Sequence, residues 1–129
     1  MTRPGPTLAW GSAAVLALVA AHDLTHVLDD GLETRRGQLA LVALPQWLFL
    51  AVAMSVVLRG DPARSRAAAL VLGVSIATGF AVIHLLPFSL AAAWDLRPSV
   101  ISWVLMWLPA VAALVLAAWA AASLRYSSR

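Results

Sequence analysis

The chain has 129 residues, of which 62% are hydrophobic and 12% are charged, and this composition excludes an ordinary water-soluble domain. It contains no cysteine, which excludes disulfides, thiolate metal sites, iron–sulfur clusters and cysteine nucleophiles. The formal net charge of +3 results from nine basic and six acidic residues, and the basic ones are all arginines in short loops beside apolar segments. Such arginines indicate membrane topology, and we expect no binding to nucleic acid.

Four apolar segments are long enough to cross a hydrocarbon core of about 30 Å, which takes about 20 helical residues. They cover residues 8–28, 39–58, 67–88 and 100–124. We therefore expect a single domain over residues 1–129: an all-α membrane protein that forms a four-transmembrane-helix bundle with up-down-up-down topology. An alternative for the first segment is a cleaved secretory signal, but its apolar character continues past the small residues Val19 to Ala21 to a full spanning length.

The arginines are divided unequally between the two ends of this bundle. Six fall on the side of the termini (Arg3, Arg59, Arg64, Arg66, Arg125 and Arg129) and three on the other (Arg35, Arg36 and Arg97). By the positive-inside rule, both termini are cytoplasmic. The all-arginine basic set and the abundance of Ala, Leu and Val favour a bacterial source, so we expect a multi-pass protein of the bacterial inner membrane.

The end of the first segment carries ionisable groups, which are costly at membrane depth and usually serve a function there. At roughly 100° per residue, His22, His26 and Asp29 lie within about 60° of one another on a helix, with Asp30 just beyond. Asp23 falls on the flank of this stripe. Two aspartates in a last turn oppose the helix macrodipole, and a cation would compensate for them. The stripe therefore predicts a metal site.

The loop that follows the first segment allows another interpretation of its acids. Asp30 precedes Glu33 by three residues, the spacing of a helix capping box, and Gly31 can end the preceding helix. For these two acids alone, a tight turn into the second helix is the simpler interpretation.

The second segment has Pro45, Gln46 and Trp47 in its first half. Proline removes a backbone hydrogen bond inside a helix, so we expect a kink between Leu41 and Pro45. The Gln46 amide then has two alternatives: a hydrogen bond toward the histidines, or one to the carbonyl that the proline frees.

The third segment has small residues at every fourth position: Ala69, Gly73, Ala77 and Ala81. Such a stripe lets helices approach closely. His84 follows Gly73 by eleven residues and Ala77 by seven, so it lies on the same face and should point into the bundle. At 1.5 Å per residue, all three histidines share one depth within roughly a turn.

The fourth segment concentrates its polar and aromatic residues in the first half, including Trp107, and Ser102, Trp103 and Met106 lie near the depth of the histidines. We expect a polar pocket that opens outward there. Its predicted cofactor-binding or ligand-binding residues are Gln46, Trp47, Trp103, Met106 and Trp107.

Our leading functional hypothesis is a divalent transition metal, Zn, Fe, Ni or Cu, bound for transport, sensing or catalysis. Imidazole and carboxylate suit these ions. The predicted ligands are His22, His26, Asp29, Asp30 and His84. Catalysis would also need a general base, for which Asp23 is the candidate.

Three alternatives stay open. A b-type haem could take His84 and one other histidine as axial ligands. A binder or enzyme for a lipid-soluble small molecule could use His and Asp in an apolar pocket framed by tryptophans. The polar groups could also form hydrogen bonds that hold the helices together in a non-catalytic accessory subunit. A homo-oligomer in the lipid bilayer is plausible, because four short helices bury little polar surface on their own.

Overall fold

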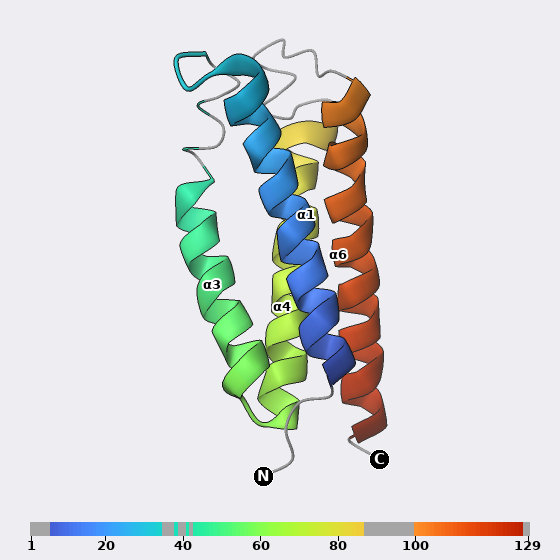
Figure 1. Ribbon diagram of the computed structural model, residues 1–129. Coiled ribbons are helices and arrows are strands. Elements are labelled where there is room, and N and C mark those ends of the chain that lie inside the picture. Colours follow the sequence, from blue (N-terminus) through green and yellow to red (C-terminus); the bar gives the residue numbers. More distant parts are fainter. Residues whose placement is uncertain (1–5, 35–37, 39–40, 42, 87–99, 128–129) are drawn as a thin grey trace.

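The computed structural model describes residues 6–34, 38, 41, 43–86 and 100–127, and at positions 29, 30, 102 and 127 it describes the backbone alone. The long helices are α1 (Pro6–Asp30), α3 (Leu44–Arg59), α4 (Pro62–Phe80) and α6 (Val100–Ser127). A π-helix, η1 (Ala81–Leu85), continues α4. The helices alternate in direction, so α1 begins at the end of the bundle where α6 finishes (Figure 1). The expected all-α four-helix bundle is confirmed.

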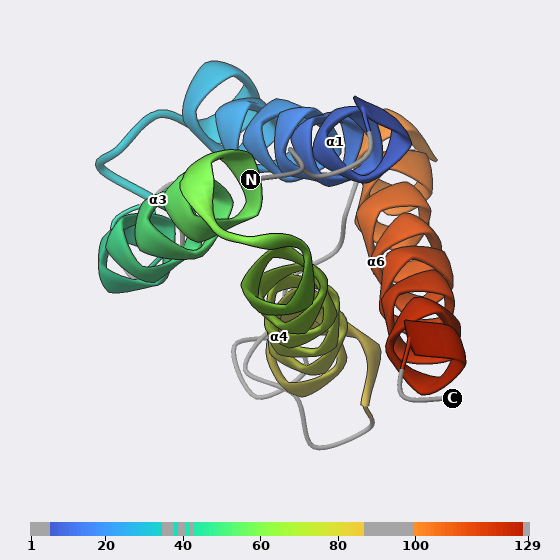
Figure 2. The same cartoon turned by 90° about the horizontal axis from the view of Figure 1, so that it is seen from below.

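Helix α4 has the most extensive packing, against α6 on one side and α3 on the other, while α1 lies between α3 and α6 (Figure 2). Gly73 explains how closely α4 approaches α6. A Cβ atom at this position would lie 2.6 Å from the backbone oxygen of Ala113 and 3.0 Å from the Cβ of Ala117. The small-residue stripe therefore includes a position where a side chain cannot fit without moving a helix.

Aliphatic side chains make up most of the core from the middle of the bundle to the end where α1 begins, and Ser12 and Ser65 are also completely buried near that end. Leu50 and Val57 on α3, and Leu72 and Ile76 on α4, are completely buried. Lipid tails are as apolar as these side chains, so helices in a membrane associate through close packing rather than through exclusion of water. The helices are closely packed in this part of the bundle.

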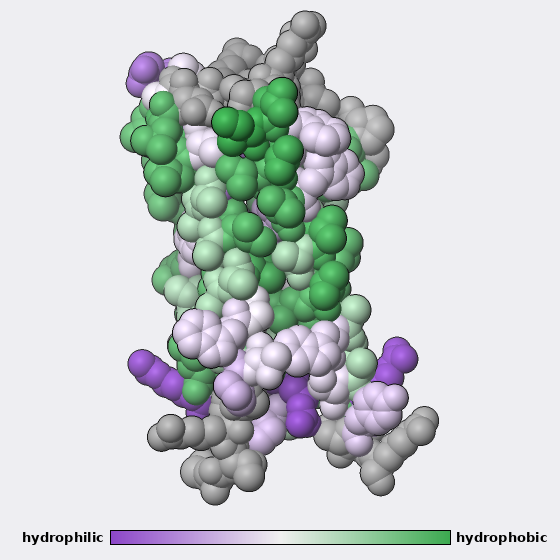
Figure 3. All heavy atoms as spheres, turned by 45° about the vertical axis from the view of Figure 1, so that its right-hand side comes forward, coloured by the Kyte–Doolittle hydropathy of each residue, from purple (hydrophilic) through white to green (hydrophobic). Residues whose placement is uncertain are grey.

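Three stretches are long and apolar enough to cross a membrane: Pro6–Leu28, Pro62–Leu85 and Trp103–Tyr126. The apolar helix α3 is shorter, with 16 residues. Figure 3 shows a hydrophobic band around the middle of the bundle and hydrophilic side chains at its lower end. Trp10 and Tyr126, near that end, are 76% and 81% exposed, as expected of aromatic residues at a membrane interface.

Helix α3 starts later than the predicted segment. It begins at Leu44, and Pro45 lies in its first turn. A proline there removes no helical hydrogen bond, because the first N–H groups of a helix have no partner inside it. Pro45 therefore starts α3 instead of kinking it.

Helix α4 starts earlier than predicted, because Asp61 caps it. The Oδ1 atom of Asp61 accepts hydrogen bonds from the backbone N–H groups of Ala63 and Arg64, both at 3.0 Å. The bond from Arg64 is the largest cause of the lowered pKa of Asp61. Asp61 also pairs with the exposed Arg64 side chain at 3.2 Å, a contact that contributes little at a surface.

Candidate metal centre

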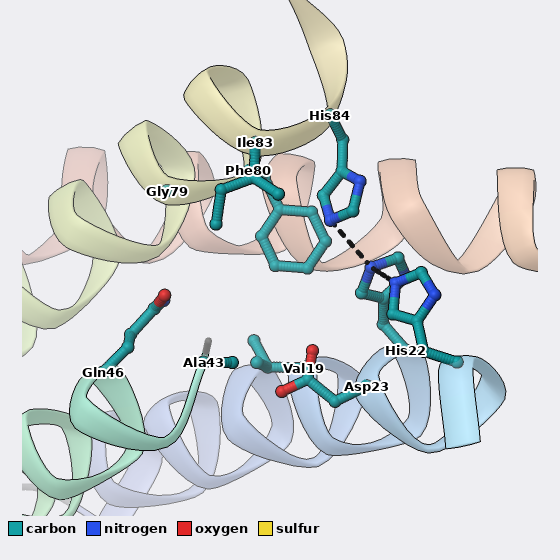
Figure 4. Close-up of a pocket in the computed structure, with 10 residues that line it drawn as sticks. Val19, His22, Asp23, Ala43, Gln46, Gly79, Phe80, Ile83 and His84 are labelled. Atoms are coloured by element: carbon teal, nitrogen blue, oxygen red, sulfur yellow. Dashed lines mark hydrogen bonds between the residues drawn. The ribbon is translucent and has the colours of Figure 1, made fainter. Parts of the chain in front are cut away.

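Three histidine rings meet between α1 and η1 (Figure 4). His22 and His26 lie one turn apart on α1, and His84 projects toward them from η1. The Nε2 atom of His22 lies 3.1 Å from Nε2 of His26 and 3.2 Å from Nε2 of His84. The potential ligand atoms of the three rings all lie within 4.8 Å of one another. Two segments that are 62 residues apart in the sequence thus supply one cluster.

The cluster is shielded from its surroundings. His22 is 1% exposed and His26 is 5% exposed, while His84 is partly buried. The Phe80 ring lies 4.8 Å from the His22 ring and 5.6 Å from the His84 ring, measured between centroids. The rings of His26 and His84 are nearly parallel, with an interplanar angle of 12°. The Phe80 ring thus covers one side of the cluster.

Hydrogen bonds among neutral histidines explain only part of this geometry. A neutral imidazole nitrogen carries either one proton or one lone pair. The Nε2 atom of His22 faces two other Nε2 atoms, and a single proton or lone pair cannot pair well with both. An ion that accepts lone pairs from all three nitrogens would satisfy every contact at once.

The second nitrogen of His22 is also unusual. Nδ1 of His22 is buried, and no hydrogen-bond partner for it exists among the residues that the structure describes. Buried polar atoms are normally paired, and the exceptions often mark functional sites. The ring therefore is not held in place by its own hydrogen bonds alone.

A small pocket adjoins the histidines. Its volume is about 20 Å³, and a cavity of about 10–15 Å³ on this measure holds one water molecule. The polar side chains that line it, besides the histidines, are Asp23 from α1 and Gln46 from α3. Figure 4 shows the carboxylate of Asp23 on the pocket side of α1, while Gln46 extends from α3 toward Gly79. The pocket therefore has a nitrogen-rich wall and an oxygen-rich wall.

Asp23 is fixed by a hydrogen bond between helices. The indole Nε1–H of Trp47 donates to Oδ2 of Asp23 at 2.6 Å. This bond ties α1 to the first turns of α3 beside the pocket. Trp47, predicted as a ligand-binding residue, thus contacts a carboxylate of the candidate site.

Gly79 keeps the pocket open on the side of α4. A Cβ atom at this position would lie 3.3 Å from the amide nitrogen of Gln46. A larger side chain here would occupy the space beside that amide. Sequence analysis did not single out this glycine, although it directly precedes the aromatic residue of the cluster.

The remaining predicted site residues have different positions. The side chains of Asp29 and Asp30 lie outside the described part of the structure. Met106 belongs to the buried core. Trp103 and Trp107 are 53% and 42% exposed, and their rings contact each other at 6.0 Å. None of the three side chains from α6 lines the pocket.

The π-helix is the main structural feature of the site that the sequence pattern did not predict. In η1 the backbone N–H of Leu86 donates to the oxygen of Ala81, five residues earlier, at 3.0 Å. A π turn contains more residues than an α turn and therefore redirects the side chains that follow it. Gly73 faces α6, whereas His84, expected on the same face, meets His22 of α1.

These observations define a helical protein with candidate membrane spans and a buried group of three histidines that could hold a metal ion. Comparison with protein-family models, with curated proteins and with solved structures gives no match to the chain. We therefore infer the function of the protein from the geometry of the histidine cluster.

Proposed function

We propose that this protein binds one divalent transition metal ion through His22, His26 and His84. The observation that supports the proposal most strongly is that Nε2 of His22 lies 3.1 and 3.2 Å from Nε2 of the other two histidines, while ligand atoms of all three rings lie within 4.8 Å of one another. Two imidazole nitrogens at 2.0–2.1 Å from one ion lie about 3.0 Å apart at a right angle and about 3.4 Å apart at a tetrahedral angle. Both separations fall in this range.

The donor set restricts the ion. Three neutral imidazoles suit Zn, Fe, Ni and Cu, while Mg and Ca prefer oxygen ligands. The predicted ligands Asp29 and Asp30 would add oxygen donors from the last turn of α1, and they stay a prediction. The chain has no cysteine, so a thiolate cannot compete for the ion.

The pocket supports a bare ion over the two alternatives with larger ligands. A volume of about 20 Å³ admits a group the size of a water molecule. Bis-histidine haem needs the two axial nitrogens on opposite sides of a macrocycle, whereas here Nε2 of His22 and Nε2 of His84 are in direct contact. A binding site for a drug-sized or lipid-soluble molecule takes about 300 Å³ or more.

Charge supports an orientation for the site. Arg59, Arg64, Arg66 and Arg125 lie at the end of the bundle that carries the termini, and by the positive-inside rule this end is cytoplasmic. The histidines lie toward the opposite end. The metal site would thus lie near the outer face of a bacterial inner membrane.

The rest of the core favours sensing or catalysis over transport through a single bundle. Among the described residues, the buried polar side chains outside the cluster are Ser12 and Ser65. Between them and the histidines lie Leu50, Leu72 and Ile76, all completely buried. Moving an ion past these side chains would require breaking the packed half of the bundle.

The test is the metal content of the purified protein. We expect close to one ion of Zn, Fe, Ni or Cu per chain, measured by mass spectrometry of the elements. His22→Ala should weaken binding by more than about 100-fold in a chelator competition, since even the outer partners of a ligand contribute about 10- to 100-fold. Ser12→Ala, which changes a buried polar residue on the same helix, is the matched control and should bind like the wild type. Equal metal content in both variants would refute the proposed site.

A further inference from the structure

Asp23 and Gln46 line the pocket together with the three histidines, and a small ligand could lie in the space that these side chains enclose. Three histidines leave one position of a tetrahedral ion open, the arrangement found in catalytic rather than structural zinc sites. The adjoining space, about 20 Å³, has the size for one water molecule or a group of similar size. The open position and the pocket would therefore coincide if the ion lies between the three Nε2 atoms.

The Asp23 carboxylate lies where it can accept a hydrogen bond from a ligand in this space. An ionised carboxylate has about four lone-pair sites on its two oxygens. The indole of Trp47 uses one of them, on Oδ2, at 2.6 Å. Oδ1 keeps its capacity to accept a hydrogen bond, and Figure 4 shows the carboxylate directed toward the pocket. The Gln46 amide lines the same space.

We propose that the bound ion keeps an exchangeable fourth ligand, a water molecule, which lies in this pocket and donates a hydrogen bond to Asp23. This inference rests on the proposed metal site. Trp47 is then a positioning residue, because it acts through Asp23 and does not contact the ion. Small nitrogen or oxygen donors that fit the pocket can replace the water, neutral ones more readily than anions, whereas larger ligands are excluded.

The arrangement has a chemical consequence. A metal ion with an open position binds and polarises whatever replaces the water, while a closed four-ligand ion only holds the fold together. The negative charge of Asp23 selects neutral ligands that can donate a hydrogen bond, and it disfavours anions. The pocket thus sets both the size and the charge of the ligand that reaches the ion.

Cobalt substitution with azide as the probe tests this inference. Protein loaded with Co²⁺ should show the visible absorption of a four-coordinate ion, and azide should change that spectrum with a saturable dependence on concentration. Asp23→Asn should tighten azide binding at least about tenfold, because a unit negative charge beside the anion is removed. The matched control is Asp61→Asn, the same substitution at the other end of the bundle, which should leave azide affinity unchanged.

Two further variants keep the test decisive if Asp23→Asn does not fold. Gly79→Val places bulk next to the Gln46 amide, where a Cβ is already 3.3 Å from the amide nitrogen, and should block azide without loss of Co²⁺. Trp47→Phe removes the indole donor and keeps the charge. It should change azide affinity by less than Asp23→Asn but by more than Asp61→Asn.

The outcomes separate this inference from the proposed function. Failure to bind Co²⁺ would overturn the metal site itself, and the inference with it. Co²⁺ binding without any spectral response to azide, in the wild type and in Asp23→Asn alike, would show a centre closed to exchange, which overturns the inference and leaves the metal site standing. A response that is identical in Asp23→Asn and Asp61→Asn would remove Asp23 from the pocket's chemistry.

Discussion

The two ends of this bundle are built from different interactions. From the middle of the bundle toward the termini, α4 and α6 pack so closely that Gly73 lies against the backbone of Ala113, and the described interior is mostly aliphatic, with Ser12 and Ser65 as its buried polar side chains. Toward the other end, three histidines, a carboxylate and an amide surround a small pocket. The close-packed end can hold the polar end in a fixed geometry, so the chain can place costly groups at membrane depth without losing its fold.

The largest expected effect is at the polar end, where an ion that binds the three histidines should stabilise the folded state. An ion present at about 1,000 times its dissociation constant stabilises the folded state by about 4 kcal/mol. We therefore expect added Zn²⁺ to raise the midpoint of thermal unfolding in detergent, measured by circular dichroism. In His26→Ala the shift should disappear, and in Ser12→Ala it should persist. A shift of the same size in His26→Ala would show that the ion acts elsewhere.

The packed end should respond strongly to added volume. In Gly73→Ala the new methyl group would lie 2.6 Å from a backbone oxygen, which cannot rotate away. Overpacking of this kind costs about 1–3 kcal/mol. Gly11→Ala is the matched control, since its Cβ would meet the Trp119 ring at an ordinary 3.5 Å. There the better helix propensity of alanine should stabilise α1 by up to about 1 kcal/mol.

Unfolding in denaturant of the two glycine variants measures this difference. Loss of stability in both would mean that the close approach of α4 and α6 is not what makes Gly73 necessary. Loss of metal binding in Gly73→Ala, with the helical content intact, would show that the packed end sets the geometry of the histidines.

The hydrogen bond between Trp47 and Asp23 belongs both to the packing of α1 against α3 and to the polar pocket, because it lies beside that pocket. Trp47→Phe keeps most of the ring but leaves the Asp23 carboxylate without its donor. A buried acceptor that loses its partner costs about 1–3 kcal/mol. The double variant with Asp23→Leu should recover part of this loss, since both polar partners are then removed. Strictly additive effects in the double-mutant cycle would contradict the contact.

The smallest effect is expected from the cap of α4. The folded-state pKa of Asp61 is lowered, first by the backbone N–H of Arg64. A lowered pKa means that the cap stabilises the protein fully above the ordinary aspartate value of 3.8 and loses this effect as the pH falls through the lower folded-state value. Asp61→Ala should therefore unfold at a lower temperature than the wild type at about pH 7, and the gap should close at about pH 2. A difference in unfolding temperature that widens in acid would contradict the lowered pKa of Asp61.

The sequence predicted those parts of the molecule that depend on local spacing. The apolar segments predicted four helices, and the interval between His22 and His26 predicted that their rings share one helix face. Each of these follows from the regular period of a helix, so no knowledge of the neighbouring helix was needed.

Features that depend on contacts between helices could not be read in the same way. Trp47 finds its partner on a different helix, 24 residues away. Trp103 and Trp107 were predicted to bind a ligand, yet they contact each other and do not line the pocket. The π turn breaks the helical period itself, and Pro45 starts a helix that the hydropathy pattern began earlier. The composition of a segment indicates how deep its residues lie in the membrane. The direction in which each side chain points is set by how its helix packs against the neighbouring helices.

The most direct test of the central claim is X-ray absorption spectroscopy of the protein loaded with Zn²⁺. We expect the bound Zn²⁺ to have about three nitrogen neighbours at 2.0–2.1 Å, with the multiple-scattering pattern of imidazole rings, and one further light-atom ligand. His84→Ala should reduce the imidazole contribution by a third. A first shell of oxygen alone, or an imidazole signal that is unchanged in His84→Ala, would contradict a centre shared by α1 and η1.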